Sequence, residues 1–283
     1  MIVFKNIQEI QEYLKKLKKS KKLLGFVPTM GALHSGHISL IEQSKKENEV
    51  TICSIFVNPT QFNSEEDLKK YPRTIEKDIK KLIEAECDVL FYPDCNEMYP
   101  KEEINSAEDY GHITSRLEGK FRPGHFNGVI NIVTKLFATI NPDTAYFGQK
   151  DFQQCAVIKE LIKRNGFNIK LNCCPTLREE DGLAMSSRNM RLSNEERKQA
   201  SQIYVALQWI KLNFKAKTVA ELKMEARKII EEMPLLKTEY IEICNADTFE
   251  IMPRKIEGRR LVALAAVYCG NVRLIDNLGV GLT

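Results

Sequence analysis

Residues 23–37 read LLGFVPTMGALHSGH. The apolar run Leu23–Val27 predicts a buried strand, and the small and polar residues after it predict a loop that leads into a helix. Gly31 and Gly36 would allow the backbone of this loop to come close to a ligand. A buried strand, a loop and a helix in succession are typical of a parallel α/β sheet.

The same pattern recurs through the first 175 residues. Apolar residues at i, i+3, i+4, i+7, i+8 and i+11 from Val129 predict a helix. Four more apolar runs predict buried strands at Val50–Val57, Val89–Tyr92, Thr144–Phe147 and Asn168–Cys173. This alternation indicates an α/β fold with a Rossmann-like parallel sheet and helices on both faces. Ligands of such sheets bind beyond the carboxyl ends of the strands, so residues that follow the strands are the first site candidates.

After Cys174 the pattern changes. Ser193 with Glu196 and Thr218 with Glu221 form capping boxes, which predict two helix starts. The first of these helices has one apolar face, made of Ile203, Leu207, Ile210 and Phe214. Strands are predicted at Glu239–Cys244, Arg260–Tyr268 and Val272–Ile275, the last two joined by a Gly270-Asn271 hairpin turn. We therefore expect two domains, residues 1–175 and a smaller α+β domain of residues 176–283.

The composition is that of a globular protein. Of 283 residues, 43% are hydrophobic and 28% are charged, which excludes disordered and low-complexity chains. The net charge of +4 is too small to indicate a nucleic-acid-binding protein by itself. The longest apolar run, Leu261–Cys269, is shorter than the ~20 residues that span a bilayer, and Lys5 and Glu9 interrupt any N-terminal signal. We expect a soluble, cytoplasmic protein without a membrane partner.

The eight cysteines do not predict a disulfide framework, because they are dilute in a chain of this length. No C-x-x-C pair occurs, and the adjacent Cys173 and Cys174 are poorly placed to bind one zinc ion together. We expect free thiols, most of them buried.

Residues 15–22 read KKLKKSKK. This basic run has two interpretations, a patch for RNA or anionic membranes and the solvated end of a helix that starts near Ile7. We favour the helix end, since most charge runs are solvated faces.

Four segments carry residues suited to chemistry. His34 and His37 follow the first strand at a predicted helix start, where imidazoles and free backbone amides can donate to phosphate oxygens. A zinc site is less plausible there, because no third ligand has an obvious spacing. Lys150, after Gly148, is a cation suited to phosphate, and Gln154 is a polar residue on an otherwise apolar helix face.

The other two segments offer neutral and basic donors. Asn58 and Gln61 are amides at the end of an apolar strand and suit a ligand with both hydroxyl and carboxylate groups. Residues 181–189 contain two hydroxyls and Arg188, a compact set of oxyanion donors. A further basic loop, residues 122–126, has little specificity of its own.

Together these segments resemble the pantothenate synthetase (pantoate–β-alanine ligase) family, within the HxGH nucleotidylyltransferase superfamily. The resemblance is carried by residues 27–31, 34–37, 54–62, 71–74, 147–154, 181–189 and 273–277, so it extends over nearly the whole chain. It departs from the family at Gln149, where Glu is more common.

The resemblance implies an ATP-dependent ligation of pantoate to β-alanine through pantoyl adenylate, with AMP and pyrophosphate released. It implies His37 as proton donor, with His34 and Lys150 as further catalytic residues. It implies pantoate and β-alanine sites at Gln61, Gln154 and Asn58. The implied ATP-binding residues are Met30, Gly31, Ala32, Leu33, His34, Ser35, Gly36, His37, Gly148, Gln149, Lys150, Asp151, Leu177, Met185, Ser186, Ser187 and Arg188.

Further expectations follow from this resemblance. Mg²⁺ is expected to accompany ATP, with Asp78 as a candidate outer partner, although the sequence identifies no metal ligands. The first domain would bind nucleotide and pantoate, and the second, together with residues 63–70, would act as a lid. The family is usually dimeric, so we expect a homodimer whose other partners are small molecules and not nucleic acid.

Other functions stay open from the residues alone. Another HxGH enzyme could transfer AMP to a phosphorylated acceptor, although the neutral Gln61 and Gln154 suit a small hydroxy acid better. A tRNA ligase is disfavoured by the short second domain and weak net charge. A catalytically silent nucleotide- or RNA-binding protein is the third alternative.

Overall fold

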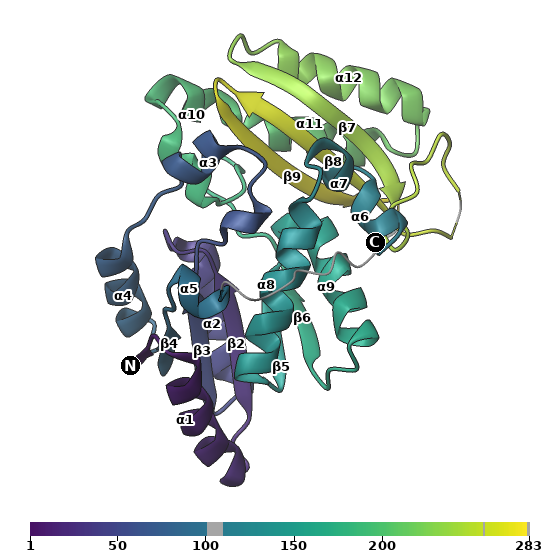
Figure 1. Cartoon of the computed structure of the whole chain (residues 1–283). Helices are drawn as coiled ribbons and strands as arrows, with labels where there is room; N and C mark the ends of the chain where they lie inside the picture. Colours follow the sequence, from purple (N-terminus) through teal and green to yellow (C-terminus); the bar gives the residue numbers. More distant parts are fainter. Residues whose placement is uncertain (101–109, 257, 282–283) are drawn as a thin grey trace. The chain divides into compact units, whose positions relative to one another are not determined.

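The computed structural model describes residues 1–100, 110–256 and 258–281 (Figure 1). The chain divides into two compact units, each described by itself below. Unit 1 comprises residues 1–149 and 153–175. Unit 2 comprises residues 150–152 and 176–283, so three residues from the later part of the expected first domain group with the second unit.

Unit 1 is built on a six-stranded, wholly parallel sheet with the order β1-β4-β3-β2-β5-β6. Its strands are β1 (Ile2–Phe4), β2 (Leu24–Thr29), β3 (Val50–Ile55), β4 (Val89–Phe91), β5 (Thr144–Gly148) and β6 (Lys170–Cys174). The strand order reverses at β2, which pairs with β3 on one side and β5 on the other. Ligands of doubly wound sheets bind at the carboxyl ends of the strands at such a reversal.

Helices cover both faces of this sheet, as predicted. Helices α1, α8 and α9 pack on one face around Leu14, Phe26 and Phe137, and α2 and α4 pack on the other around Ile41 and Leu82. Along this part of the chain the helices are α1 (Ile7–Lys19), α2 (Ser35–Glu47), α3 (Glu65–Lys70), α4 (Ile75–Glu84), α5 (Cys95–Met98), α6 (His112–Ser115), α7 (Glu118–Phe121), α8 (His125–Ile140) and α9 (Phe152–Arg164), with the 3₁₀ turns η1 (Pro59–Gln61) and η2 (Gln149–Asp151).

Unit 2 contains an antiparallel sheet with the order β7-β8-β9. Its elements are η3 (Ser187–Arg191), α10 (Asn194–Ala200), α11 (Gln202–Asn213), α12 (Val219–Glu231), β7 (Leu236–Asn245), β8 (Leu261–Cys269) and β9 (Val272–Val280). Both predicted capping boxes are present, at Ser193 and Thr218, and Gly270-Asn271 joins β8 to β9. The α/β plus smaller α+β prediction is confirmed.

Two details differ from the prediction. The three-residue edge strand β1 was not predicted, because Ile2–Phe4 is too short to give a pattern. The single helix expected after Ser193 is two helices, α10 and α11, divided at Ser201, whose hydroxyl donates to the Lys198 carbonyl at 3.3 Å. Hydroxyls bonded to a preceding carbonyl often bend helices.

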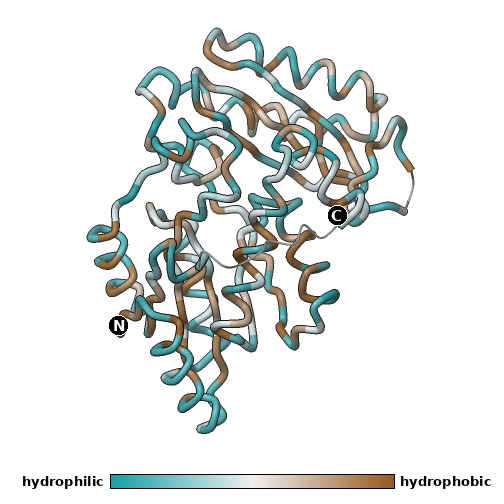
Figure 2. The backbone as a smooth tube through the Cα atoms, viewed as in Figure 1, coloured by the Kyte–Doolittle hydropathy of each residue, from teal (hydrophilic) through white to brown (hydrophobic). Residues whose placement is uncertain are grey.

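Polarity follows the same plan in each unit. Figure 2 shows apolar residues concentrated along the strands, and apolar and polar residues alternating along α1 and α12. The basic run of residues 15–22 includes the last turns of α1, where Lys15, Lys16 and Lys19 are exposed. Six of the eight cysteines are buried and all are free thiols, as expected; Cys95 and Cys173 are exposed. Within the described part of the chain, no helix is both long and apolar enough to cross a membrane.

Candidate active site

The two histidines of residues 23–37 lie at the start of α2, which follows β2 after a short loop. His34 is the N-cap residue, and its Nδ1 accepts a hydrogen bond from the Gly36 amide at 3.2 Å. His37 Nδ1 accepts one from the His34 amide at 3.4 Å, and the ring centroids are 4.0 Å apart. A ring nitrogen that accepts a hydrogen bond carries no proton, so each neutral ring has its N–H at Nε2. Both rings are therefore Nε2 donors at a helix end that already favours anions.

Asp78 of α4 shapes the loop before these histidines. Its side chain is buried, and its two carboxylate oxygens accept hydrogen bonds from the Ala32 and Leu33 amides, both at 2.8 Å. The Thr74 hydroxyl donates to the same carboxylate at 3.2 Å. Ala32 has a left-handed backbone with φ of 50°, which is unfavourable for a residue with a Cβ. The bonds to Asp78 stabilise this conformation and present the loop to α2.

Gln61 lies beside that loop, and its side chain contacts uncharged groups. It is buried in the turn η1, and its Nε2 lies 3.0 Å from the sulfur of Met30. Asn58 Nδ2 donates to Gln61 Oε1 at 3.1 Å and to the Gly128 carbonyl at 3.0 Å. Asn58 Oδ1 accepts from the hydroxyls of Thr60 at 2.9 Å and Tyr99 at 2.8 Å. The Asn58 side chain thus fixes Gln61.

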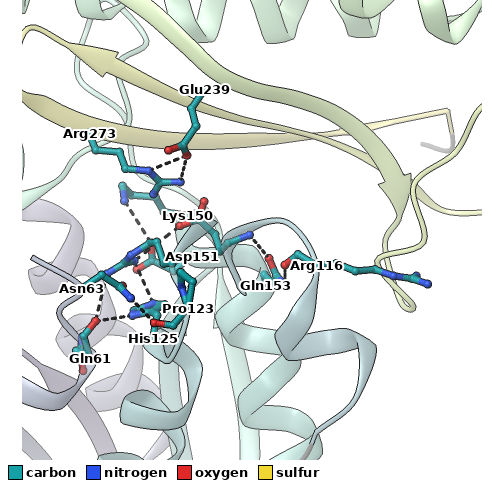
Figure 3. A network of polar contacts seen from close by, with 12 residues as sticks. Gln61, Asn63, Arg116, Pro123, His125, Lys150, Asp151, Gln153, Glu239 and Arg273 are labelled. Atoms are coloured by element: carbon teal, nitrogen blue, oxygen red, sulfur yellow. Dashed lines mark hydrogen bonds and ion pairs between the residues drawn. The ribbon is translucent and has the colours of Figure 1, made fainter. Parts of the chain in front are cut away.

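A second set of contacts holds the backbone of Gln61. His125 Nδ1 lies 2.8 Å from the Gln61 carbonyl oxygen (Figure 3). Arg122 Nη2 donates to the same oxygen at 3.4 Å. Glu118, which is buried, places a carboxylate oxygen 3.7 Å from Arg122 Nη1. The loop of residues 122–126, which carried little specificity as sequence, is therefore a support for Gln61.

Of the two adjacent glutamines in α9, Gln153 is the buried and fully bonded one. Its Oε1 accepts from the Glu118 amide at 3.1 Å, and its Nε2 donates to the Ile113 carbonyl at 2.9 Å. Its Nε2 also donates to the Arg116 carbonyl at 2.9 Å (Figure 3). Gln154 is half-buried. Gln153 thus has a structural role, and Gln154 is the more exposed of the two glutamines.

In unit 2, Lys150 and the segment of residues 177–189 carry the predicted phosphate donors. Lys150 Nζ lies 3.3 Å from Asp151 Oδ1. Arg178 and Ala184 form an isolated antiparallel bridge, and the Leu177 carbonyl accepts from the Met185 amide at 3.0 Å. Ser186 caps η3 by accepting from the Arg188 amide at 3.3 Å, and Ser187 is buried.

The carboxylates near the candidate site indicate how Mg²⁺ could be bound there. Across the described residues, no group of three or more His, Cys, Asp or Glu side chains could hold a metal ion. Asp78 already accepts three hydrogen bonds from the protein, and Asp151 is paired with Lys150. These residues fit an ion carried mainly by nucleotide phosphates, as is usual for Mg²⁺, and not one in a protein cage.

Comparisons with known proteins agree over nearly the whole chain. A family model described as Pantoate-beta-alanine ligase matches residues 2–279. A pantothenate synthetase of Caldicellulosiruptor bescii is 50% identical over 283 residues, covering 99% of each chain.

Solved structures agree as well. A pantothenate synthetase of Thermus thermophilus superposes with a TM-score of 0.91 at 38% identity, covering 98% of this chain and 99% of that chain. A pantoate-β-alanine ligase of Francisella tularensis, complexed with beta-gamma ATP and β-alanine, superposes with a TM-score of 0.83 at 39% identity, covering 98% and 97%. The chain belongs to the pantoate–β-alanine ligase family.

Proposed function

We propose that this chain ligates pantoate to β-alanine at the expense of ATP, producing pantothenate, AMP and pyrophosphate. The observation that carries the proposal is the 3.0 Å contact between Met30, at the start of the histidine loop, and the Gln61 side chain. This contact supports the proposal because the histidine loop would bind phosphate and the amides of Asn58 and Gln61 would suit a hydroxy acid. Formation of an acyl adenylate requires that proximity.

In the first step, a pantoate carboxylate oxygen would bond to the α-phosphorus of ATP while the bond from that phosphorus to the bridging oxygen of pyrophosphate breaks. Negative charge grows on the phosphate oxygens, and the Nε2 donors of His34 and His37, with Lys150, would stabilise it. In the second step, the β-alanine amine would attack the acyl carbon of pantoyl adenylate, AMP would leave, and the amine would lose a proton.

The remaining residues have roles in this proposal. Gln61 and Gln154 would bind pantoate, with Gln61 also meeting β-alanine, and Asn58 would contribute by fixing Gln61. Mg²⁺ bound to ATP would neutralise phosphate charge. The ATP contacts would be residues 30–37, Gly148, Gln149, Lys150 and Asp151, together with Leu177 and residues 185–188.

The test is pantoate-dependent exchange of labelled pyrophosphate into ATP, which reports the first step alone. His37→Ala should lower the exchange rate by about 10²–10³, the usual effect of losing one preorganised donor. His112→Ala is the control, because His112 is exposed on α6. Exchange that requires a phosphorylated acceptor in place of pantoate would contradict the proposal.

The glutamines give a second readout. Gln154→Ala should raise the KM for pantoate much more than the KM for ATP, because the lost amide pairs only with the acid. Equal effects on both substrates would remove Gln154 from the acid site.

The lid, the homodimer and the cytoplasmic location expected in the sequence analysis are part of this proposal. Residues 63–70 include α3, capped by Ser64, and Asn63 donates to the Pro123 carbonyl. Hydrogen exchange of this segment should slow when ATP and pantoate bind together, and sedimentation should give twice the chain mass of 32.5 kDa. Unchanged hydrogen exchange would exclude the lid.

A further inference from the structure

The backbone of Lys150 is held by a residue far along the chain. Asn277 of β9 donates from Nδ2 to the Lys150 carbonyl oxygen at 2.8 Å, across 127 positions of sequence. The Asn277 side chain is buried, with 6% of the residue exposed. Fixing a carbonyl limits the backbone torsions of its own residue, and these torsions set the direction in which the side chain leaves the backbone.

Asn277 is in turn fixed by a buried ion pair. The backbone N–H of Asn277 donates to Asp276 Oδ1 at 2.7 Å, and its backbone carbonyl accepts from Arg178 Nη2 at 3.3 Å. Arg178 contacts both carboxylate oxygens of Asp276, at 2.6 and 3.0 Å, in the bidentate geometry that gives strong directional bonds. The guanidinium also lies 3.8 Å from the centre of the Tyr204 ring.

The same ion pair fixes the other phosphate-binding segment of unit 2. Arg178 Nη1 donates to the Gly182 carbonyl at 3.0 Å, and Gly182, with φ of 90°, packs so closely on Tyr204 that a Cβ would lie 2.3 Å from the ring. Arg178 also bridges Ala184, two residues before Ser186. One short stretch of β9 therefore anchors Lys150 and the segment that leads to Ser186–Arg188.

We propose that Asn277 is a positioning residue for the adenylation step, which it serves by holding the Lys150 backbone so that the ammonium group is presented to the phosphates. This inference rests on the proposed function, since it assumes that Lys150 contacts ATP. Asn277 touches no reacting atom in this scheme. Its contribution to the adenylation step would pass through Lys150.

A double-mutant cycle tests this dependence. In the pyrophosphate exchange assay, Asn277→Ala should lower the rate by as much as about 10²-fold, the scale expected when a catalytic group is misplaced. Lys150→Ala should lower it by about 10²–10³. The double variant should be no slower than Lys150→Ala, because a positioning residue has nothing left to position. If the double variant instead lost the product of the two single losses in exchange rate, the inference would be overturned.

Two further variants complete the experiment. Asn277→Asp keeps the shape of the side chain but faces the Lys150 carbonyl with an oxygen, so it should lose as much activity as Asn277→Ala and serves if the alanine variant does not fold. Asn213→Ala removes a matched bond, Nδ2 to the Trp209 carbonyl at 2.9 Å in α11, and should leave the exchange rate unchanged. Wild-type exchange in Asn277→Asp would overturn the inference.

The same variants distinguish a failure of the proposed function from a failure of the inference about Asn277. If Lys150→Ala keeps wild-type exchange, the role proposed for Lys150 is wrong and the inference fails with it. If Lys150→Ala loses exchange while Asn277→Ala keeps it, only the inference is wrong.

Discussion

The histidine loop of unit 1 and the Lys150 segment of unit 2 are held in place by different kinds of contact. His34 and His37 are fixed by bonds within four residues of chain, and one buried carboxylate, Asp78, adds the longer contacts to Ala32 and Leu33. Lys150 depends on Asn277, and Asn277 depends on an ion pair whose members are 98 positions apart. Hydrogen bonds between neighbouring residues depend little on the packing of the rest of the fold, whereas contacts between distant residues depend on it directly. The Lys150 segment should therefore be the more fragile of the two.

Arg178→Met should have the largest effect, because it leaves the carboxylate of Asp276 buried without its partner. Asp276 is 4% exposed. Loss of one partner of a buried pair costs about 3–5 kcal/mol, and we expect this loss in the free energy of unfolding measured with urea.

The double variant Arg178→Met with Asp276→Leu is the control. Replacing both charges by apolar side chains of similar size removes the uncompensated charge, so most of the lost stability should return. A single variant that loses less than about 1 kcal/mol would show that the pair is not the anchor of unit 2.

Asp78→Asn should have the next largest effect, and it tests unit 1. The amide group of asparagine would place N–H opposite the amide of Ala32 or Leu33, leaving a buried donor unsatisfied at a cost of about 1–3 kcal/mol. The histidine loop should shift, so pyrophosphate exchange should also fall. Asp143→Asn is matched, since Asp143 accepts the Leu24 backbone amide at 2.7 Å, at the end of β2 that lies away from the histidine loop. It should cost stability but little activity.

The sequence predicted the histidine loop well because its determinants are local. A buried strand, two glycines and two histidines within residues 23–37 are enough to predict a loop and a helix start. The capping boxes at Ser193 and Thr218 were predictable for the same reason, since each involves residues three positions apart.

The supports of the site were not predictable, because each joins residues distant in sequence. Asp78 was considered as a metal partner, whereas its oxygens accept the Ala32 and Leu33 amides. Gln153 and Gln154 are alike as sequence, and only the packing of residues 113–118 distinguishes the buried one. Asn277 belonged to a segment that resembled the family but had no assigned role, and its bond to Lys150 becomes visible only in the folded unit.

Gly128→Ala should have a smaller effect on stability but a clear one on substrate binding. A Cβ at this position of α8 would lie 2.4 Å from the backbone carbonyl oxygen of Thr60 and 2.6 Å from the backbone nitrogen of Gln61. Overpacking of this kind costs about 1–3 kcal/mol, and the higher helix propensity of alanine offsets about 1 kcal/mol. The turn η1 must move, so the KM for pantoate should rise. Gly279→Ala is the control, because none of the described residues has an atom within 4 Å of a Cβ there.

The smallest effects should appear in the pH dependence of stability, with opposite signs in the two units. Hydrogen bonds from Gln43 and then Tyr146 lower the pKa of Glu47 in α2 from its ordinary value of 4.5. The folded pKa is below the unfolded one, so Glu47 stabilises unit 1 above the unfolded value, and this stabilisation is lost as pH falls through the folded pKa. Burial raises the pKa of Asp276 above 3.8, although Arg178 opposes the shift. The stabilisation that Asp276 contributes is therefore fully present below its unfolded pKa of 3.8 and is lost as pH rises through the folded pKa.

Urea unfolding of wild type, Glu47→Gln and Asp276→Asn between about pH 3.5 and 6 separates the two groups. The stability of wild type relative to Glu47→Gln should rise with pH, because the variant lacks the carboxylate that Gln43 and Tyr146 stabilise. The stability of wild type relative to Asp276→Asn should fall with pH over the same range, because only wild type must bury a charge as the carboxyl ionises. Slopes of the same sign would mean that Arg178 compensates the buried carboxylate fully. The contacts that hold Lys150 in unit 2 would then be as stable as those that hold the histidine loop in unit 1.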